Sequence, residues 1–445
     1  MRSYAEISYG TEKLGSRSLL SAVMRLARAG LFEDYVVYER NGVWAFAGGA
    51  LTTVTLDAEN VRTVTGAGES ATPWTGSSSA ALGAALEASA PVANWTAYGY
   101  LMFEFAALLP ALATRGAVPV EGELARMIVP RVEVLIDERG VVSRAWDAAD
   151  NERIREILED VAEPPRPVVS AVDIRTDEGG YRERVAQAVK EIRLGQYQKV
   201  ILSRTVDVPF ELDFAATYEL GRESNNPARS FLLRLGSWES AGFSPEVVLT
   251  VDETGQVMTQ PLAGTRAFGR GAGNDAEARR VLESDPKEIY EHAVSVRTSQ
   301  EELRRVCRPG TVAVRDFMDI KERGSVQHLA SLVSGTLGAT HTPWDALEAV
   351  FPAVTASGVP KRESLDAIVR LDETRRGLYS GAVLTFTHDG ALDAALVLRA
   401  MYGQEGRAWL RAGAGIVTDS MPDREFEETC EKLSSVAPYL VRSQG

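Results

Sequence analysis

RGLYSGAVLTFTHDGALDAALVLRAMY, residues 376–402, is the stretch of this sequence that most directly predicts the fold. Its two halves are rich in Val, Leu, Thr and Phe, and they flank Asp389-Gly390. Strand-forming runs on either side of Asp-Gly are a strong signal of a β-hairpin. Two more stretches repeat the pattern: residues 35–49, which turn at Asn41-Gly42, and residues 131–146, which turn at Arg139-Gly140. The sequence therefore predicts an extensive antiparallel sheet.

Segments with helical periodicity alternate with these hairpins. Apolar residues recur at spacings of three and four in residues 18–32, 181–195 and 293–307, which is the pattern of an amphipathic helix. Helices interspersed with antiparallel hairpins favour the α+β class. We therefore expect an α+β protein with extensive antiparallel sheet, and the length alone would allow two or three domains,.

One proline-rich stretch suggests how the chain is organised. EPPRPVVS, residues 163–170, has the composition of a linker,. It separates an N-terminal part of the α/β sandwich, residues 1–165, from a larger C-terminal region, residues 171–440. The 445 residues are enough to bury a large core,.

Composition and charge exclude several classes of function. The formal net charge of -14 argues against nucleic acid as a partner, because a phosphate backbone must be met by a basic surface,. The most apolar run, residues 96–113, is interrupted by Glu104 and Pro110 and is too short for a membrane span,. The N-terminus MRSYAEISYGTEK lacks the apolar core of a signal peptide, which favours a cytoplasmic protein,. Cys307 and Cys430 are isolated, so disulfide and zinc signals are weak,.

Two Glu-x-x-Glu pairs indicate a divalent metal. They are Glu288/Glu291 in DPKEIYEH and Glu425/Glu428 in PDREFEETCEK. Residues three apart on a helix project from one face with Cβ atoms about 5–6 Å apart, so each pair can present two oxygens to one ion. Ligation by oxygen alone favours Mg²⁺ over zinc.

The second pair lies in a segment with its own structural signals. Ser420 with Asp423 forms an S-x-x-D start signal, and Pro422 suits the first turn of a helix,. The preceding WLRAGAGIV reads as a strand that ends in Gly413 and Gly415. Bare backbone beside a helix N-terminus is suited to binding a carboxylate.

Each pair also has an ordinary structural explanation. Asp285 with Glu288 forms a capping box, and Glu428 with Lys432 forms an i,i+4 ion pair,. Either pair alone is more typical of a solvated helix face than of a metal site. The presence of both pairs beside a Gly-x-Gly strand end favours a site.

Four polar residues in the C-terminal region interrupt apolar segments. Lys199 begins the strand-like QKVILSRTVDV, where it is either a solvated strand-end lysine or a partly desolvated amine,. Glu246 begins GFSPEVVLTV, where a cap or an edge carboxylate is equally ordinary. His328 has the surroundings of a hydrogen-bonded core histidine. Arg399 in LVLRAMY would point inward in a buried strand and need an anionic partner,.

These segments resemble the chorismate-utilising enzymes, the family of anthranilate, aminodeoxychorismate, isochorismate and salicylate synthases. The resemblance covers about Tyr181 to Leu440 and keeps the family's order through KVILSR, GFSPE, PLAGTRAFGRG, ESDPKEIYEH, GSVQHL, FPAVTASGVPK, RGLYSGAV, LRAGAGIV and PDREFEETCEK. Within the family the chain looks most like the salicylate synthases that feed siderophore assembly. The first 160 residues carry little of the resemblance.

The resemblance implies one large compact α+β domain of two antiparallel β-sheets flanked by helices, and it implies a role for each matching position. The four Glu residues of the two pairs would bind Mg²⁺, which holds the ring carboxylate of chorismate. Lys199 would activate water for attack at C2, and Glu246 would protonate the departing C4 hydroxyl, which requires a raised pKa. Tyr379 and Arg399 would grip the enolpyruvyl carboxylate. The remaining substrate contacts would come from Gly264, Thr265, His328, Thr355, Gly413 and Lys432.

Two positions separate the relatives. Aminodeoxychorismate synthases carry a reactive lysine where this chain has Ala263, and anthranilate synthases carry no lysine at the position of Lys199 and use ammonia, usually from a glutaminase. The resemblance therefore predicts a cytoplasmic, Mg²⁺-dependent salicylate synthase that makes salicylate and pyruvate through isochorismate by an isomerase and a lyase step. We expect a monomer without a glutaminase subunit. The alternatives are an isochorismate synthase that stops at isochorismate, and a non-catalytic or partner-dependent chorismate-binding subunit.

Overall fold

The computed structural model describes residues 2–14, 18–112, 120–160, 167–323 and 326–443. The helices are α1 (Leu19–Arg28), α2 (Ser78–Ser89), α3 (Ala148–Glu159), α4 (Tyr181–Arg193), α5 (Phe214–Ser224), α6 (Ala272–Ser284), α7 (Pro286–Leu303), α8 (Pro343–Val350), α9 (Lys361–Leu371) and α10 (Pro422–Leu433). The strands are β1 (Ala5–Tyr9), β2 (Tyr35–Arg40), β3 (Val43–Leu56), β4 (Asn60–Thr65), β5 (Gly68–Pro73), β6 (Thr96–Leu101), β7 (Ala125–Asp137), β8 (Gly140–Ala145), β9 (Lys199–Val208), β10 (Arg229–Leu235), β11 (Trp238–Ser244), β12 (Val247–Val251), β13 (Gln256–Thr259), β14 (Leu262–Ala267), β15 (Ala313–Val314), β16 (Asp319–Arg323), β17 (Val326–Ala330), β18 (Val333–Thr336), β19 (Gly358–Val359), β20 (Ala382–Thr387), β21 (Leu392–Leu396), β22 (Ala400–Gln404) and β23 (Arg407–Ile416).

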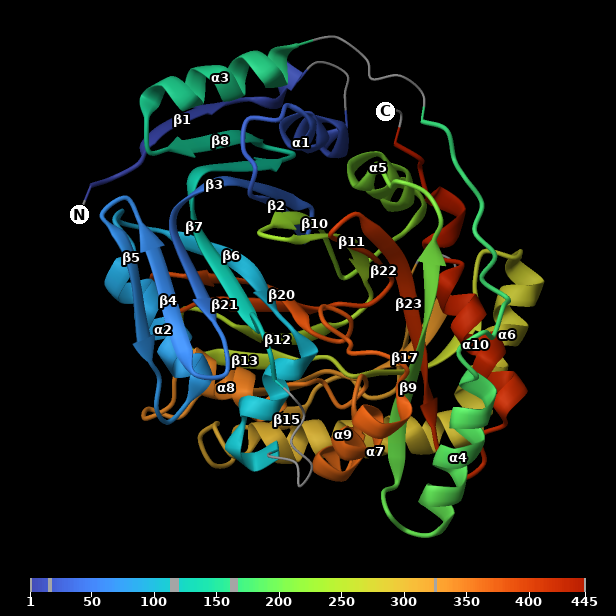
Figure 1. Ribbon diagram of the computed structural model, residues 1–445. Coiled ribbons are helices and arrows are strands. Elements are labelled where there is room, and N and C mark those ends of the chain that lie inside the picture. The colour runs from blue at the N-terminus through green and yellow to red at the C-terminus, as the bar shows by residue number, and fades with distance from the viewer. Residues whose placement is uncertain (1, 15–17, 113–119, 161–166, 324–325, 444–445) are drawn as a thin grey trace.

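The strands form a large central sheet system covered by helices. In Figure 1, α1, α3 and α5 lie along the top of the strands, α7, α8 and α9 along the bottom, and α4, α6 and α10 to the right. Antiparallel pairing links 20 strands into one network, and β14, β17 and β16 form a separate three-stranded sheet. The predicted α+β class with two antiparallel sheets is confirmed.

The hairpins turn close to the predicted positions. Asn41 and Gly42 both have positive φ, 53° and 78°, which is the two-residue turn that matches strand twist,. Asp389 and Gly390 lie in the connection between β20 and β21. The third hairpin differs by one residue, because Gly140 pairs with Asp137 and therefore begins β8 after the turn.

Strands from both parts of the chain pair with each other, which makes the fold a single domain. β10 pairs with β2, and β20 pairs with β6. The boundary between residues 1–165 and 171–440 therefore does not interrupt the sheet, and it stays a prediction as a division within the domain. The predicted linker, residues 163–170, lies partly outside the described residues.

The predicted helices are present, with two differences at their ends. Residues 293–307 cover the second half of α7, which begins earlier at Pro286 and is capped by the Asp285 side chain. α10 begins at Pro422 as predicted, but its N-cap is Met421. The proposed start signal at Ser420 is wrong, because the hydroxyl of this residue accepts the N–H of Val417 instead.

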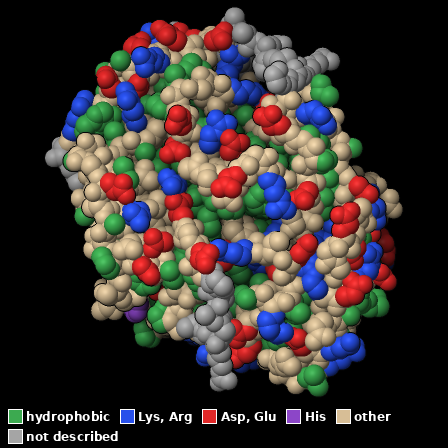
Figure 2. Space-filling model, in the orientation of Figure 1, with side chains coloured by type: hydrophobic (Ala, Val, Ile, Leu, Met, Phe, Trp, Pro, Cys, Tyr) green, Lys and Arg blue, Asp and Glu red, His purple; other side chains and the backbone are tan. Residues whose placement is uncertain are grey.

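The apolar run at residues 96–112 forms β6 and two short 3₁₀ helices rather than one long helix. Within the described ranges, no helix combines the length and the apolar character needed to cross a bilayer. Lys and Arg side chains are intermixed with Asp and Glu side chains over the face shown in Figure 2.

Candidate active site

A cavity opens where β9, β23 and α10 meet α7 and the small sheet. It collects side chains from positions far apart in the sequence. Its wall consists of Ile201, Pro245, Glu246, Leu262, Ala263, Gly264, Thr265, Glu291, His328, Thr355, Ala356, Tyr379, Leu398, Arg399, Ala400, Arg411, Ala412, Gly413, Gly415, Glu428, Lys432, Leu433 and Val436. Every residue predicted for the site lines this cavity except Lys199, Glu288 and Glu425, and these three contact or adjoin residues that do.

Lys199 lies at the start of β9 and is 2% exposed. Its Nζ atom is 2.9 Å from Glu291 Oε1 and 3.1 Å from Ser295 Oγ, and both partners belong to α7. The Ser295 hydroxyl also donates to the carbonyl of Glu291. The interpretation as a solvated strand-end lysine is wrong, because this amine is held inside the protein beside a carboxylate.

Glu246 follows β11 and is 4% exposed. One of its carboxyl oxygens accepts a short hydrogen bond from the hydroxyl of Thr355. Burial raises the pKa of Glu246 to about 8, against the opposing effects of the Thr355 hydrogen bond and the charges of Lys199 and Lys432. The carboxyl is therefore largely protonated at neutral pH, as the predicted role of proton donor requires.

Arg399 presents an unpaired charge to the cavity. Among the described residues, its guanidinium has no hydrogen-bond or ion-pair partner. Desolvation lowers the pKa of Arg399 to about 10, which leaves it charged at neutral pH. The residue lies between β21 and β22 rather than within a strand, and its φ is 51°. A non-glycine residue in this conformation is strained, and such residues cluster at active sites and ligand-binding sites.

Tyr379 and Gly413 form the adjoining wall. Tyr379 is 2% exposed and precedes Ser380, whose φ is also positive at 63°. A Cβ atom at Gly413 would lie 2.8 Å from the Tyr379 hydroxyl oxygen and 2.5 Å from the carbonyl oxygen of Leu202, so only glycine fits here. Gly413 lies inside β23, which continues to Ile416, rather than at the predicted strand end.

His328 and the turn at Gly264 close the cavity from the small sheet. His328 Nδ1 is 3.0 Å from the carbonyl oxygen of Gly264 and 3.3 Å from Thr265 Oγ1. Burial and the charge of Arg399 lower the pKa of His328 to about 3, so the ring is neutral. Its Nε2 atom is buried without a hydrogen-bond partner in the described residues, and it is the acceptor when Nδ1 donates to the Gly264 carbonyl,.

The first Glu pair projects from the N-terminal half of α7. The Asp285 side chain accepts the backbone N–H groups of Lys287 at 3.0 Å and of Glu288 at 3.5 Å, and the second bond is half of the predicted capping box. Glu288 instead pairs with Arg266 at 3.2 Å. Burial and the neighbouring carboxylates of Glu291 and Glu428 raise the pKa of Glu288 to about 7.

The second Glu pair projects from α10 and is buried. Lys432 Nζ is 2.7 Å from Glu428 Oε1 and donates to the Gly413 carbonyl at 2.7 Å, so the i,i+4 pair exists but faces the cavity. Lys432 and Lys287 lower the pKa of Glu428 to about 2 despite its burial. Glu425 pairs with Lys287 at 2.8 Å, and its Oε2 atom is buried without a partner among the described residues.

The chemistry of this donor set suits a hard divalent cation. All four side chains offer only carboxylate oxygen, and burial together with the negative charges of Glu291 and Glu428 raises the pKa of Glu288,. The orphaned Oε2 atom of Glu425 is a further free acceptor. In the part of the chain that the structure describes, however, no three acidic, His or Cys side chains stand in an arrangement that would hold a metal ion. Each of the four carboxylates instead forms an ion pair with a lysine or arginine side chain.

Three charged residues beside the cavity were not predicted as site residues. Asp372, Arg376 and Arg411 form a buried cluster behind Tyr379, and Arg411 lines the cavity itself. Arg376 stands at the start of the RGLYSGAV segment, so its position was visible in the sequence. Nothing in the patterns around Asp372 or Arg411 signalled their meeting, because it depends on long-range packing.

Residues 34–438 match the family of chorismate binding enzymes. Because the match covers most of the chain, this protein belongs to that family. It is 48% identical over 423 residues to a salicylate synthase of Mycolicibacterium paratuberculosis, and the alignment covers 95% of this chain and 93% of that protein. It is 35% identical over 303 residues to an anthranilate synthase component 1 of Halobacterium salinarum, which covers 66% of this chain and 56% of that protein.

Solved structures share the fold. The menaquinone-specific isochorismate synthase MenF of Escherichia coli aligns with a TM-score of 0.76 at 18% identity, covering 98% of this chain and 95% of that one. Anthranilate synthase component I of Streptococcus pneumoniae aligns with a TM-score of 0.73 at 23% identity, covering 89% and 92%. At these identities the structural likeness establishes the fold alone.

Proposed function

We propose that this chain is a salicylate synthase that converts chorismate through isochorismate to salicylate and pyruvate. The observation that carries the proposal is one cavity lined by the largely protonated carboxyl of Glu246 and by the guanidinium of Arg399, which is unpaired among the described residues. The buried amine of Lys199 lies behind the cavity wall. The identity of 48% to a salicylate synthase over nearly the whole chain supports the same substrate and product.

The first step moves a hydroxyl group on the ring. Lys199, when its amine is neutral, removes a proton from water as the oxygen attacks C2 of chorismate. Glu246 gives its proton to the C4 hydroxyl, which leaves as water while the ring double bonds shift. One C–O bond forms and one breaks, so isochorismate is an isomer of chorismate.

The second step releases pyruvate from bound isochorismate. The ether C–O bond at C3 breaks, and the hydrogen on C2 passes to the enolpyruvyl methylene carbon, which becomes the methyl group of pyruvate. The ring becomes aromatic, so the step needs mainly orientation in a cavity from which water is excluded. Tyr379 and Arg399 are the groups proposed to hold the enolpyruvyl carboxylate, because a carboxylate would give the unpaired guanidinium its missing partner.

We also propose that Mg²⁺ is the resident cofactor. When bound, it would neutralise the ring carboxylate of the substrate and orient the ring. The residues that would hold it are Glu288, Glu291, Glu425 and Glu428. Their oxygen-only chemistry and the unpartnered Oε2 of Glu425 support this assignment,.

Two residues favour water as the nucleophile. Ala263 lies in the cavity wall at the position where aminodeoxychorismate synthases carry a lysine. This chain therefore has no amine there that could form a covalent intermediate. Lys199 is buried at the position where anthranilate synthases lack a lysine. Both features argue against ammonia and against the need for a glutaminase subunit.

One assay tests the proposed function. Purified protein should convert chorismate with Mg²⁺, and without ammonium, into fluorescent salicylate and an equal amount of pyruvate. The concentration of isochorismate should rise and then fall. Isochorismate that reaches a plateau without salicylate would identify an isochorismate synthase. Ammonium-dependent anthranilate would overturn the role of Lys199, and no turnover would favour a non-catalytic or partner-dependent subunit.

The resemblance to the salicylate synthases that feed siderophore assembly also suggests a cellular role. We infer that the salicylate serves siderophore biosynthesis in the cytoplasm and that the enzyme acts as a monomer. The 48% identity to a salicylate synthase supports salicylate as the product that this role requires. Size measurement of the active protein in solution would show whether a second copy is needed for turnover.

A further inference from the structure

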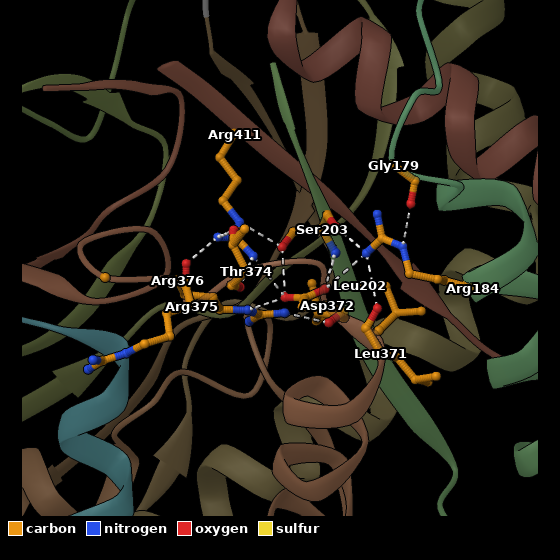
Figure 3. Close-up of polar contacts among 12 residues, drawn as sticks. Gly179, Arg184, Leu202, Ser203, Leu371, Asp372, Thr374, Arg375, Arg376 and Arg411 are labelled. Carbon is orange, nitrogen blue, oxygen red and sulfur yellow. Dashed lines mark hydrogen bonds and ion pairs between the residues drawn. The ribbon is translucent and has the colours of Figure 1, made fainter. Parts of the chain in front are cut away.

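A buried cluster of charged residues stands directly behind the Tyr379 wall of the cavity. The side chains of Asp372, Arg376 and Arg411 are 3%, 1% and 2% exposed. Asp372 Oδ2 is 2.7 Å from Arg376 Nε and 3.2 Å from Arg411 Nη2. The same carboxylate accepts the backbone N–H of Ser203 at 2.9 Å and its hydroxyl at 2.8 Å. Figure 3 shows these side chains converging on Asp372.

Arg376 connects separate parts of the cavity wall through a single guanidinium. Besides binding Asp372, its Nη1 atom donates to the Ala356 carbonyl at 2.7 Å, and its Nη2 atom donates to the Ile201 carbonyl at 2.7 Å. Ala356 follows Thr355, the hydrogen-bond partner of the proposed acid. Ile201 lies two residues beyond Lys199 on β9. The guanidinium therefore joins the segments that carry the acid's partner and the amine.

The same cluster holds the third part of the wall, which is Tyr379. Its ring centroid lies 5.6 Å from the guanidinium carbon of Arg376 and 5.5 Å from that of Arg411. Its backbone N–H donates to the Arg376 carbonyl at 3.1 Å. Cations at this distance from an aromatic ring are attracted to it, so both arginines restrict the position of the ring.

Every nitrogen atom of the two guanidinium groups already donates to a protein acceptor. Arg376 uses Nε, Nη1 and Nη2 on protein acceptors, as described above. Arg411 donates from Nε to Ser203 Oγ at 2.9 Å, from Nη1 to the Arg375 carbonyl at 2.6 Å and from Nη2 to the Thr374 carbonyl at 3.0 Å. Arg399 differs from both arginines, because its guanidinium has no partner among the residues that the structure describes. The cluster therefore acts on the residues that bind substrate rather than on the substrate.

We propose that Arg376 is a positioning residue that fixes Thr355 and Tyr379 together, so that the proton donor and the carboxylate-binding wall stay aligned on one substrate. This inference rests on the proposed function, because it takes Glu246 as the acid and Tyr379 as a substrate contact. A misplacement of about 1 Å in such groups can reduce a rate by about 10²-fold.

Arg376→Lys separates the charge of this residue from its geometry. A lysine keeps a positive charge beside Asp372, but a single ammonium cannot reach three acceptors that lie in the different directions of a planar fork. Arg375→Lys is the matched control, because Arg375 is the neighbouring residue and is exposed. Among the described residues, its side chain donates only to the Glu121 carbonyl, at 3.2 Å.

The test measures kcat, KM and their pH dependence for salicylate formation from chorismate. Arg376→Lys should lower kcat/KM by about 10- to 100-fold and raise KM, because Tyr379 is displaced. The high-pH limb of kcat should move to higher pH, because the Thr355 hydrogen bond lowers the pKa of Glu246 and its loss raises that pKa. Arg375→Lys should match the wild type. A variant with unchanged kcat/KM, or with lower kcat but unchanged KM and pH limb, would overturn the proposal.

A binding measurement separates this inference from the proposed function. Calorimetry of chorismate with Glu246→Gln, alone and combined with Arg376→Lys, needs no turnover and should show about tenfold weaker binding in the double variant. If the wild type makes no salicylate but this difference is found, the proposed function is wrong, and Arg376 still positions the wall that binds chorismate. If the wild type makes salicylate and the two affinities are equal, the positioning role is wrong.

A second variant keeps the test decisive if Arg376→Lys does not fold. Asp372→Asn preserves the size of the side chain and an acceptor oxygen while it weakens the hold on both arginines. It should raise KM and move the pH limb in the same directions, by smaller amounts. A folded Asp372→Asn protein with wild-type KM and pH profile would exclude a positioning role for the cluster.

Discussion

The hydroxyl of Thr355 donates a hydrogen bond to the carboxyl group of Glu246 in the wall of the cavity. This contact occupies one carboxyl oxygen. Burial raises the pKa of Glu246 to about 8, so the group carries a proton at neutral pH. A protonated carboxyl whose one oxygen is already engaged can direct its O–H toward the cavity, which is the arrangement that a general acid needs.

The first prediction follows from this pKa. Because the protonated form of Glu246 is the active form, chorismate turnover should fall as the pH rises through about 8,. Glu246→Gln should lower turnover by at least about 10²-fold, the scale for loss of a general acid. Rates measured from pH 6 to 10 check both points. A wild-type rate that stays level to pH 10 would argue against Glu246 as the acid.

A stability measurement tests the same pKa without catalysis. In the unfolded chain Glu246 ionises near the usual glutamate pKa of about 4.3, whereas in the folded protein it stays protonated to about pH 8,. Folding therefore loses stability as the pH rises between these values, and the loss is complete above the folded-state pKa. Glu246→Gln removes this effect, so its melting temperature relative to wild type should be higher at pH 8.5 than at pH 5. Equal differences at both values would contradict the raised pKa.

The amine and the acid should be dispensable for the second half of the reaction. Lys199→Gln should lower chorismate turnover by at least about 10²-fold, because the attack of water then lacks a base. The same variant should still make salicylate from supplied isochorismate, which already carries the C2 hydroxyl. Comparing the two substrates on one protein preparation checks this, and equal losses on both would show that Lys199 has another role.

How far the sequence predicts this site depends on how local each signal is. Lys199, Glu246 and the two Glu pairs stand in segments that resemble the family's motifs, so the resemblance predicted that they would lie in or beside one cavity. Local spacing failed where packing decides the outcome. Lys199 looked like a solvated strand end because the α7 carboxylate that covers it lies about 90 residues away, at Glu291. The Asp372 cluster has no local pattern at all.

Removal of the metal should affect activity and stability together. Turnover should stop in excess EDTA and return with added Mg²⁺, and Mg²⁺ should raise the melting temperature of the wild type because it binds only the folded state. Glu428→Gln should be nearly inactive and show no such rise. Loss of one partner in a buried ion pair can itself cost about 3–5 kcal/mol, so the shift caused by Mg²⁺ is compared within each variant.

The neighbouring residue on α10 provides the control for that experiment. Glu427 is 39% exposed on its side chain and pairs with Arg175 on the surface. Glu427→Gln removes the same charge one position away and should keep both turnover and the response to Mg²⁺. Full turnover of the wild type in EDTA, or equal behaviour of Glu427→Gln and Glu428→Gln, would defeat the metal assignment.

The last prediction concerns Gly415, which lies inside β23 and faces α7. A Cβ atom at this position would lie 2.3 Å from Glu291 Oε1, so Gly415→Ala must displace that carboxylate from its contact with Lys199. The carboxylate is the flexible end of a side chain, and alanine loses less backbone entropy than glycine on folding, so the melting temperature should change little. Turnover should nevertheless fall by at least about tenfold, because catalytic groups tolerate little misplacement. Gly66→Ala, where nothing lies within 4 Å of the added Cβ, should leave turnover unchanged. An active Gly415→Ala enzyme would show that the place of Glu291 beside Lys199 does not matter for the reaction.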